Sequence, residues 1–375
     1  MKIGIVGGGQ LARMMALAGY PLGIRCTVLD PNSDACAGQV APLVLAKYDD
    51  VDALGRLMDE VDVLTFDFEN VSVPALRTLA DRTGIFPPLD ALECAQDRLS
   101  EKTLFTRLAI PTPPFAPVAS RAELDAAIED IGLPCVLKTR RMGYDGKGQA
   151  MIQSVADIAA AWDRLGDQGE LLLEGFVKFK REVSVISVRD RKGNIRHYPL
   201  SENKHRDGIL TNCFAPAAAD DVQGQAYHHA EKLLEHFQYV GVLAVEFFDV
   251  DGTLVVNEMA PRVHNSGHWT IDGAETSQFE NHLRAILGWP LGSTDAIGYS
   301  AMLNWIGAMP DPSLALNSDR AHWHDYGKKP RPGRKVGHTT IHTESAAELH
   351  AEMAKFATSL GNQLASGADA FLIKR

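Results

Sequence analysis

The chain has 375 residues, of which 45% are hydrophobic and 23% charged, and its formal net charge is −11. This length is typical of two or three domains of roughly 100–200 residues each. The acidic balance argues against a protein that coats nucleic acid, and no run of about 18 apolar residues indicates a membrane-spanning helix. The five cysteines are scattered without a CxxC pair. We therefore expect a cytoplasmic protein with neither nucleic-acid nor membrane partners.

Residues 1–90 alternate between strand-like and helical patterns. Apolar runs such as "KIGIV" and "VDVLTFDF" are separated by segments with apolar residues every three or four positions, for example Leu11, Met14 and Met15. Such a spacing is typical of an amphipathic helix. The alternation predicts a parallel sheet joined by right-handed crossover helices.

The first turn, "GIVGGGQLA", fits the pattern G-x-G-x-x-A at Gly7, Gly9 and Ala12, and Asp30 ends the next strand. This arrangement is typical of a dinucleotide-binding site. Backbone N–H groups at a helix N-terminus bind any phosphate, however. The turn therefore has three interpretations: a structural turn, a phosphate contact for another substrate, or an NAD site.

Residues 90–109 are predicted to form one long helix, with acidic residues early and basic residues late, as the helix dipole prefers. The proline-rich stretch "IPTPPFAPV" that follows marks a boundary. Further on, "ELLLEGFV", "REVSVISVRD" and "NIRHYPL" predict strands of a largely antiparallel sheet.

The stretch "CVLKTRRMGYDGKGQAMI" places Gly143, Gly146 and Gly148 in a turn between two strands. Glycines let backbone N–H groups approach an anion and let a loop move, and Lys147 offers a point charge to a phosphate. We predict a hairpin lid over the phosphates of a nucleotide, and a solvated surface hairpin is the alternative. Lys138 ends an apolar strand before the lid, where a lysine needs an anionic partner unless its head group reaches solvent.

The segment "ELLLEGFVKFKREV" places Glu174 at the end of a buried strand and Glu182 eight residues later. A short linker after such a strand suits adenine, and Glu182 suits ribose hydroxyls. Each glutamate taken alone also fits a solvated surface.

The strongest local pattern is "AVEFFDVDGTLVVNE", in which "DVDG" predicts a hairpin turn. Glu246 and Glu258 are cross-strand neighbours if the loop has three residues, and one step out of register if it has two. Two unit charges about 4 Å apart repel by ~4 kcal/mol at an effective dielectric constant near 20. A Mg²⁺ ion between the carboxylates, with an oxygen from Asn257, would offset this repulsion, as would protonation of one of them.

Two polar clusters follow this hairpin. The loop "RVHNSGHWT" concentrates donors that suit a small anion or a sugar phosphate: Arg262, His264, Asn265, Ser266 and His268. The loop "YGKKPRPGRKVGH" holds a basic cluster that suits a phosphate, or that is simply solvated: Lys328, Arg331, Arg334 and Lys335.

The order of these motifs resembles the ATP-grasp superfamily across essentially the whole chain, and within it the N5-carboxyaminoimidazole ribonucleotide synthetase family. The resemblance rests on "GGGQLARM", "FDFENV", "QDRLSEK", "LKTRRMGYDGKGQ", "EGFV", "NEMAPRVHNSGHWT" and "YGKKPRPGRKVGH". It implies a fold of α/β and α+β parts. These are an N-terminal Rossmann-like parallel-sheet domain over residues 1–95, an ATP-grasp domain over 96–290 with a glycine-rich lid over about 112–180, and a C-terminal domain over 291–375.

The resemblance also implies the ligand contacts. ATP would be bound by Arg98, Lys138, Gly143, Tyr144, Asp145, Gly146, Lys147, Gly148, Gln149, Glu174, Gly175, Phe176, Val177, Glu182, His205, Asn257 and Glu258. Mg²⁺ would be held by Glu246 and Glu258. The ribonucleotide would meet Glu69, Asn70, Tyr144, Asp145, Asn265 and Ser266, and its phosphate Lys328, Arg334 or Lys335. The residues nearest the reacting groups would be Lys147, Arg262 and His264, with bicarbonate beside the last two.

The implied activity is the carboxylation of 5-aminoimidazole ribonucleotide by bicarbonate and ATP, through carboxyphosphate, in a homodimer. Asp67 replaces a Glu that the family often carries, and Val263 replaces a common Pro. Neither change removes an implied ligand. Three alternatives stay open: a formate-dependent glycinamide ribonucleotide transformylase of the same superfamily, an NAD-dependent oxidoreductase, and a non-catalytic nucleotide sensor.

Overall fold

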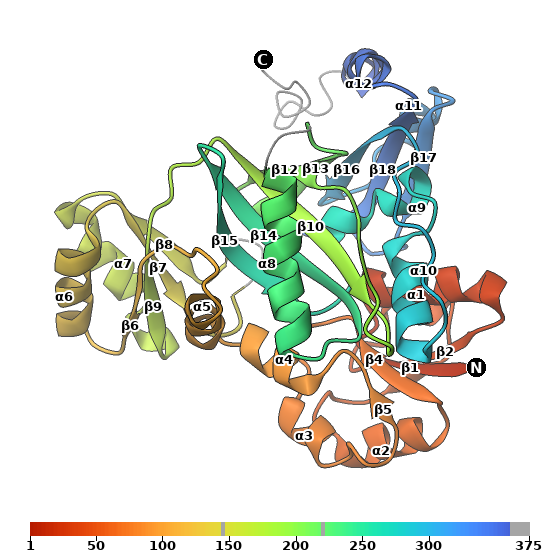
Figure 1. Ribbon diagram of the computed structural model, residues 1–375, viewed down its shortest axis with the longest axis horizontal. Coiled ribbons are helices and arrows are strands. Elements are labelled where there is room, and N and C mark those ends of the chain that lie inside the picture. The colour runs from red at the N-terminus through yellow and green to blue at the C-terminus, as the bar shows by residue number, and fades with distance from the viewer. Residues whose placement is uncertain (144–146, 219–221, 361–375) are drawn as a thin grey trace.

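The computed structural model describes residues 1–143, 147–218 and 222–360, and three sheets organise them (Figure 1). In this part of the chain, no helix combines the length and the apolar character needed to cross a membrane. Tyr144, Asp145 and Gly146, which belong to the predicted lid, lie outside the described residues.

The N-terminal sheet has the strand order β3-β2-β1-β4-β5, and its paired strands are parallel, as predicted. Both faces are buried, which is usual for parallel sheets: Ile3 and Ile5 pack on one side, Val6 and Phe66 on the other. The strands are β1 (Lys2–Val6), β2 (Arg25–Asp30), β3 (Leu43–Leu45), β4 (Val63–Phe66) and β5 (Gly84–Ile85), and the helices are α1 (Gln10–Gly19), α2 (Val51–Asp59) and α3 (Val73–Arg77).

The predicted single helix over residues 90–109 is wrong, because the chain forms α4 (Leu89–Ala95) and α5 (Arg98–Arg107) instead. Asp97 separates them with an extended backbone, and its carboxylate accepts a hydrogen bond from the N–H of Leu99. The same carboxylate binds Arg140 at 2.6 Å. Capping by this anion therefore starts a second helix and fixes its direction.

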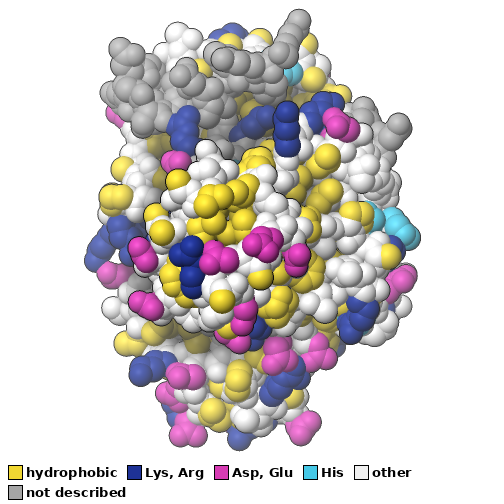
Figure 2. Space-filling model, turned by 90° about the vertical axis from the view of Figure 1, so that its left-hand side faces the viewer, with side chains coloured by type: hydrophobic (Ala, Val, Ile, Leu, Met, Phe, Trp, Pro, Cys, Tyr) yellow, Lys and Arg dark blue, Asp and Glu magenta, His cyan; other side chains and the backbone are white. Residues whose placement is uncertain are grey.

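A four-stranded antiparallel sheet with its own two helices lies at the left of Figure 1, and we call it the four-stranded unit. Its core is a separate cluster that includes the buried Leu124, Leu137 and Leu173. Figure 2 views this unit end on, and acidic and basic side chains are intermixed on the face drawn. Its elements are β6 (Phe115–Val118), α6 (Arg121–Ile131), β7 (Cys135–Thr139), β8 (Gln149–Ile152), α7 (Ile158–Leu165) and β9 (Leu171–Gly175), in the order β6-β9-β7-β8.

The largest sheet has the order β15-β14-β10-β12-β13-β16-β18-β17, with β11 beside β10. The sequence predicted β10, β11, β14 and β15 but missed β12, which is mostly polar, and β13; the chain turns between these two strands at Asp207 and Gly208, both with positive φ. Strands β16 to β18 continue this sheet into the C-terminal part of the chain. Its strands are β10 (Arg181–Arg189), β11 (Ile195–His197), β12 (Ser201–Arg206), β13 (Ile209–Ala215), β14 (Gly241–Val250), β15 (Thr253–Ala260), β16 (Tyr299–Ile306), β17 (Ala321–Asp325) and β18 (Lys335–Thr343).

Helices cover both faces of this large sheet. Helix α8 packs on β10 and β14 through a cluster that includes Leu233 and Val245, and α10 packs between the large sheet and α1. The N-terminal sheet is thereby fixed to the large one. The helices are α8 (Val222–His236), α9 (Thr270–Gly273), α10 (Gln278–Leu287), α11 (Pro312–Leu316) and α12 (Ala346–Leu360).

Candidate active site

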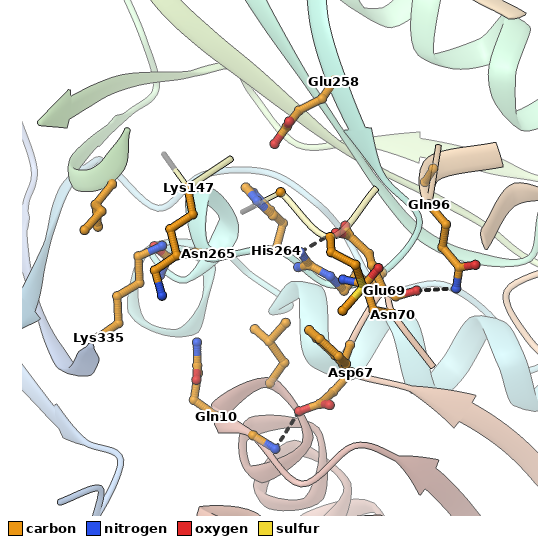
Figure 3. Close-up of a pocket in the computed structure, with 18 of the residues that line it drawn as sticks. Gln10, Asp67, Glu69, Asn70, Gln96, Lys147, Glu258, His264, Asn265 and Lys335 are labelled. Carbon is orange, nitrogen blue, oxygen red and sulfur yellow. Dashed lines mark hydrogen bonds and ion pairs between the residues drawn. The ribbon is translucent and has the colours of Figure 1, made fainter. Parts of the chain in front are cut away.

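Two connected clefts open among the described residues where the three sheets meet. The sheet cleft, of about 440 Å³, lies between the four-stranded unit and the large sheet. The loop basin, of about 680 Å³, lies between the N-terminal sheet's loops and the 328–335 loop (Figure 3). Both are lined by Arg98, Lys147, Glu258, His264, Asn265 and Lys335. A group bound in one cleft therefore lies next to a group bound in the other.

The predicted ligand residues divide between the two clefts. Besides the shared residues, the sheet cleft is lined by Lys138, Gln149, Glu174, Gly175, Phe176, Val177, Glu182, His205, Glu246 and Asn257. The loop basin is lined by Glu69, Asn70, Gly143, Arg262, Lys328 and Arg334. Gly148 and Ser266 line neither cleft.

Glu246 and Glu258 are register partners on β14 and β15. The turn is a two-residue loop, Asp251 and Gly252, with φ of 51° and 87°. A two-residue loop alone would leave the glutamates out of register. The register shifts by one residue between Glu246 and Phe247, so that Asn257 has no direct partner and the two carboxyl groups face each other.

These two glutamates have different environments. Burial and the charge of Glu258 raise the pKa of Glu246, against the lowering effect of His205. Glu258 is 42% exposed at its side chain and lies 3.4 Å from the guanidinium of Arg98. Paired oxygen donors of this kind, with Asn257 beside them, suit a hard cation such as Mg²⁺.

Glu174 is the centre of a buried charge cluster. Its carboxylate lies 3.0 Å from the ammonium of Lys138 and 3.4 Å from that of Lys102, and the side chain is 4% exposed. Burial would raise the pKa of Glu174, but the two lysines and Arg98 lower it to about 2. Burial also lowers the pKa of Lys138, against the effect of Glu174. Lys138 was predicted to need an anionic partner, and that partner is Glu174. Glu174 itself was predicted to contact adenine.

The rest of the sheet cleft combines an apolar floor with polar edges. Phe176 and Val177 follow directly after β9, and the carboxylate of Glu182 lies 2.5 Å from Nδ1 of His205. Burial opposes protonation of His205, but Glu182 and Glu246 raise its pKa. Strands β7 and β8 form the predicted hairpin, with Lys138 paired to Gln149.

The loop basin concentrates positive charge. Arg262 forms an ion pair with Glu69 at 3.0 Å, while Lys328 donates to the side-chain oxygen of Gln10 and to the carbonyl of Lys335. Burial lowers the pKa of Lys328 to about 8. Figure 3 shows Lys147 and Lys335 entering the same space beside Asn265.

The "HNSGH" loop places its residues at different depths. His264 lines both clefts, and burial holds its pKa well below the ordinary value. Ser266 is fully buried behind it and its hydroxyl lies 2.9 Å from Nδ1 of His264, so Ser266 orients the imidazole. Asn265 exchanges two hydrogen bonds with Asn304.

The glycine-rich first turn is occupied by the protein's own carboxylates. Asp67 accepts from the N–H groups of Gly9 and Ala12 at the start of α1, and Asp30 accepts from Gly8 and from the hydroxyl of Tyr48. A dinucleotide pyrophosphate needs these N–H groups, and its ribose needs Asp30. The NAD interpretation is therefore wrong, and the structural one accounts for the motif. Asp67 is buried in this role, and burial raises its pKa to about 6.

Sequence reasoning missed several residues in the site. Glu101 and Lys102 share one face of α5 with Arg98, since they follow it by three and four positions. The spacing within "DRLSEK" could have indicated this. Burial, foremost, and the nearby Glu258 raise the pKa of Glu101 to about 8. Gln10 and Asn304 gave no such signal, because each reaches the site through a contact distant in sequence.

Comparison with known proteins agrees with this architecture. Residues 1–96 match the ribonucleotide synthetase preATP-grasp domain, residues 103–279 the ATP-grasp domain and residues 300–352 the phosphoribosylaminoimidazole carboxylase C-terminal domain. The fold and the site thus define an ATP-grasp ligase, which confirms the predicted fold class.

Individual relatives show which family of ATP-grasp ligases is most similar to this chain. The N5-carboxyaminoimidazole ribonucleotide synthase of Pseudomonas aeruginosa is 51% identical over 355 residues, 95% of this chain and 98% of the relative. The crystal structure of N5-carboxyaminoimidazole ribonucleotide synthetase from Thermus thermophilus is 51% identical with a TM-score of 0.91, and covers 96% of this chain and 98% of its own.

A third relative carries ligands. The N5-carboxyaminoimidazole synthase of Aspergillus clavatus, crystallised with ADP and 5-aminoimidazole ribonucleotide, is 33% identical with a TM-score of 0.89, and covers 96% of this chain and 98% of its own. The chain belongs to the N5-carboxyaminoimidazole ribonucleotide synthase family.

Proposed function

We propose that this enzyme uses ATP and bicarbonate to carboxylate the 5-amino group of 5-aminoimidazole ribonucleotide, giving N5-carboxyaminoimidazole ribonucleotide, ADP and phosphate. The observation that carries the proposal is the junction of the two clefts at Arg98, Glu258 and His264. A phosphoryl donor in one cleft and an amine in the other then share one reaction space. The ligands of the Aspergillus relative, ADP and the ribonucleotide, suit two such adjacent clefts.

ATP is assigned to the sheet cleft. Adenine would lie against the segment from Glu174 to Val177 and ribose against Glu182, while Lys138 and Arg98 would face the phosphates. Because Lys138 is paired with Glu174, its ammonium is held in place before a nucleotide arrives. The hairpin loop between β7 and β8, with Lys147 at its described end, would cover the phosphates.

Glu246 and Glu258 would hold Mg²⁺, since two facing carboxylates of which one is buried require a compensating charge. When bound there, the ion neutralises charge on the transferring phosphoryl oxygens. Arg98, 3.4 Å from Glu258, adds a fixed positive charge of the chain's own beside that position.

Bicarbonate is assigned to Arg262 and His264, where its oxygen can attack the γ-phosphorus to form carboxyphosphate and release ADP. His264 is neutral here, so it can donate a hydrogen bond without a charge of its own. Carboxyphosphate is a mixed anhydride that water destroys. Closure of the hairpin lid over the cleft, which excludes water, is therefore part of the chemistry.

The ribonucleotide is assigned to the loop basin, with its phosphate near Lys328, Arg334 and Lys335 and its base toward Glu69, Asn70 and Asn265. Its amine then captures the carboxyl group, and phosphate leaves. We also propose the domain limits 1–95, 96–290 and 291–375, and a homodimer in the cytoplasm.

A coupled assay of ADP release tests this function. We expect ADP only when bicarbonate and the aminoimidazole ribonucleotide are both present, with a loss of at least about tenfold when either is omitted. Glycinamide ribonucleotide with formate should give no ADP above background. ADP release with that pair instead would establish the transformylase, and ATP binding without ribonucleotide-dependent turnover would establish a sensor.

A further inference from the structure

A second cluster of metal-ligating side chains lies outside both clefts, where α9 meets strands β17 and β18. Asp272, His324 and His338 each offer one ligand atom, and these atoms all lie within 4.8 Å of one another. None of the three lines the sheet cleft or the loop basin. The ATP-dependent reaction therefore leaves this cluster without a role.

The fold brings the three residues together from separate elements. His324 on β17 is the register partner of His338 on β18, and their rings stack with centroids 4.2 Å apart and planes 10° from parallel. Asp272 on α9 places a carboxylate oxygen 2.8 Å from Nε2 of His324. His322, two residues before His324 on the same face of β17, has its Nδ1 3.6 Å from the other oxygen of Asp272.

His338 provides an independent sign that a ligand is missing. Its side chain is fully buried, and among the described residues its Nε2 has no hydrogen-bond partner. Its Nδ1 is engaged at 2.8 Å by the hydroxyl of Tyr326. Histidines that bind metals commonly engage the other ring nitrogen in this way, which fixes the tautomer and the ring orientation. Buried polar atoms without a partner are rare in native proteins.

The burial of the cluster also suits a bound cation. The side chains of Asp272, His324 and His338 are 11%, 26% and 0% exposed, so the cluster is largely buried and reaches solvent at Asp272 and His324.

We propose that Asp272, His324 and His338 form a zinc site, with His322 or a water molecule as the fourth ligand. Nitrogen and carboxylate donors in this ratio suit Zn²⁺ rather than Mg²⁺, which prefers oxygen. Tetrahedral coordination at about 2.0–2.1 Å places ligand atoms about 3.3 Å apart. The separation of 2.8 Å between Asp272 and His324 lies below that value, and every separation among the three ligand atoms is at most 4.8 Å, so side-chain shifts complete the site.

The position of the site gives it a structural role, which is separate from the proposed reaction. The hydroxyl of Tyr326 is hydrogen-bonded to His338, and Tyr326 begins the 326–335 segment, which lines the loop basin. The ammonium of Lys328 lies 5.6 Å from the centre of the Tyr326 ring. Zinc at His338 would fix Tyr326 and through it one wall of the loop basin. Asp272, His324 and His338 are thus positioning residues and not catalytic ones.

Zinc titration of chelator-stripped full-length enzyme tests the site. We expect one Zn²⁺ per chain by calorimetry and elemental analysis near pH 7.5, with Mg²⁺ in excess failing to compete, and visible absorption of tetrahedral Co²⁺ after cobalt substitution. His324→Gln and Asp272→Asn should weaken zinc binding by at least about 100-fold. His228→Gln, which changes an exposed histidine on α8, is the matched control and should bind as the parent does.

A second pair of measurements separates this site from the sheet cleft. Zinc binding should persist in the Glu246→Gln, Glu258→Gln double variant, even if that variant has no activity. His324 lies on the edge strand of the sheet and is partly exposed, so its variant keeps the test valid if His338→Gln does not fold. Failure of the folded parent to bind zinc, equal affinity in parent and His324→Gln, or an octahedral cobalt spectrum would each overturn the proposal and leave only an Asp272–His324 ion pair.

Discussion

The sheet cleft and the loop basin differ in how their positive charges are paired. At the sheet cleft, Lys138 and the adjacent Lys102 pair with Glu174, and Arg98 pairs with Glu258. In the loop basin Arg262 is paired with Glu69, but Lys328 and Arg334 contact amide and carbonyl oxygens, and no carboxylate of the described residues lies within ion-pair distance of either.

This difference bears on the two proposed modes of anion binding. A nucleotide in the sheet cleft would meet cations whose positions are already fixed by ion pairs. Lys328 in the basin is buried without an ion-pair partner among the described residues, and burial lowers its pKa. The phosphate of the proposed ribonucleotide would supply that partner. The four predictions that follow test this contrast.

Replacing Glu258 should have the largest effect. Glu258→Gln removes one of two facing carboxylates, and we expect ADP formation to fall by about 10³-fold or more while the fold persists. Glu231→Gln on α8 is a matched control. The side chain of Glu258 is 42% exposed and pairs with Arg98, and that of Glu231 is 45% exposed and pairs with His197. Near-normal turnover in Glu258→Gln, measured alongside unchanged thermal melting, would remove the proposed metal role.

Replacing Glu174 should chiefly reduce stability. Glu174→Gln leaves Lys138 and Lys102 buried without their carboxylate, and we expect the free energy of unfolding near pH 7 to fall by about 3 kcal/mol. The folded-state pKa of about 2 lies below the ordinary value of 4.5. The contribution is therefore complete above pH 4.5 and is lost as the pH falls toward 2.

Urea unfolding at several pH values checks this result. Glu170→Gln is the control, because its carboxylate is 67% exposed and pairs with Arg140 at the surface. It should cost less than about 1 kcal/mol. Equal losses in the two variants would contradict the view that the sheet cleft depends on a buried charge cluster.

Replacing Lys328 should affect only the basin. Lys328→Met should raise the KM for the ribonucleotide by about 10- to 100-fold and leave the KM for ATP within about twofold, since a charge-assisted contact to phosphate is lost. In the parent, kcat/KM for the ribonucleotide should decrease above about pH 8, where the buried lysine loses its proton. Lys328→Arg should shift that decrease to higher pH.

The neighbouring Lys329 provides the control for this prediction. It is 79% exposed and pairs with Asp34, so Lys329→Met should leave both KM values unchanged. A parallel rise of the KM for ATP in Lys328→Met would show that the two clefts are not separate in function.

Replacing Gly148 should have the smallest effect. Gly148 has a φ of 69°, and a Cβ there would lie 2.5 Å from Oγ1 of Thr139, so Gly148→Ala should cost about 1–2 kcal/mol of unfolding free energy. Gly23 has a nearly equal φ of 70°, in the left-handed region, and no atom lies within 4 Å of a Cβ added there. Gly23→Ala should therefore cost less by urea unfolding, and an equal cost would assign the effect to the backbone alone.

The sequence could predict the elements with strong local patterns. The parallel N-terminal sheet, the β7–β8 hairpin and the β14–β15 hairpin follow from period and turn residues, and the structure confirms them. The break at Asp97 was missed although Asp is a favoured N-cap residue, and Arg140, which also binds this carboxylate, is distant in sequence. Strand β12 was missed because its side chains are mostly polar, and it becomes a strand through its pairing with β10 and β13.

The candidate site follows the same division. Local motifs indicated Lys138, Glu182, Glu246, Glu258 and His264 one at a time, and the family resemblance joined them into one predicted site. The partners of these residues did not follow, since Glu174 with Lys102, Asp67 with α1 and Asn265 with Asn304 are contacts between separate elements.

The amino-acid sequence by itself determined which chemical groups this enzyme carries and on which local turns and strands they stand, because hydrophobic period and turn chemistry act over a few residues. The tertiary structure alone decided which charges neutralise one another, that the glycine-rich first turn holds carboxylates, and that Asp272, His324 and His338 lie together. Coulomb interactions and burial depend on distances in space, and those distances exist only once the sheets have packed together.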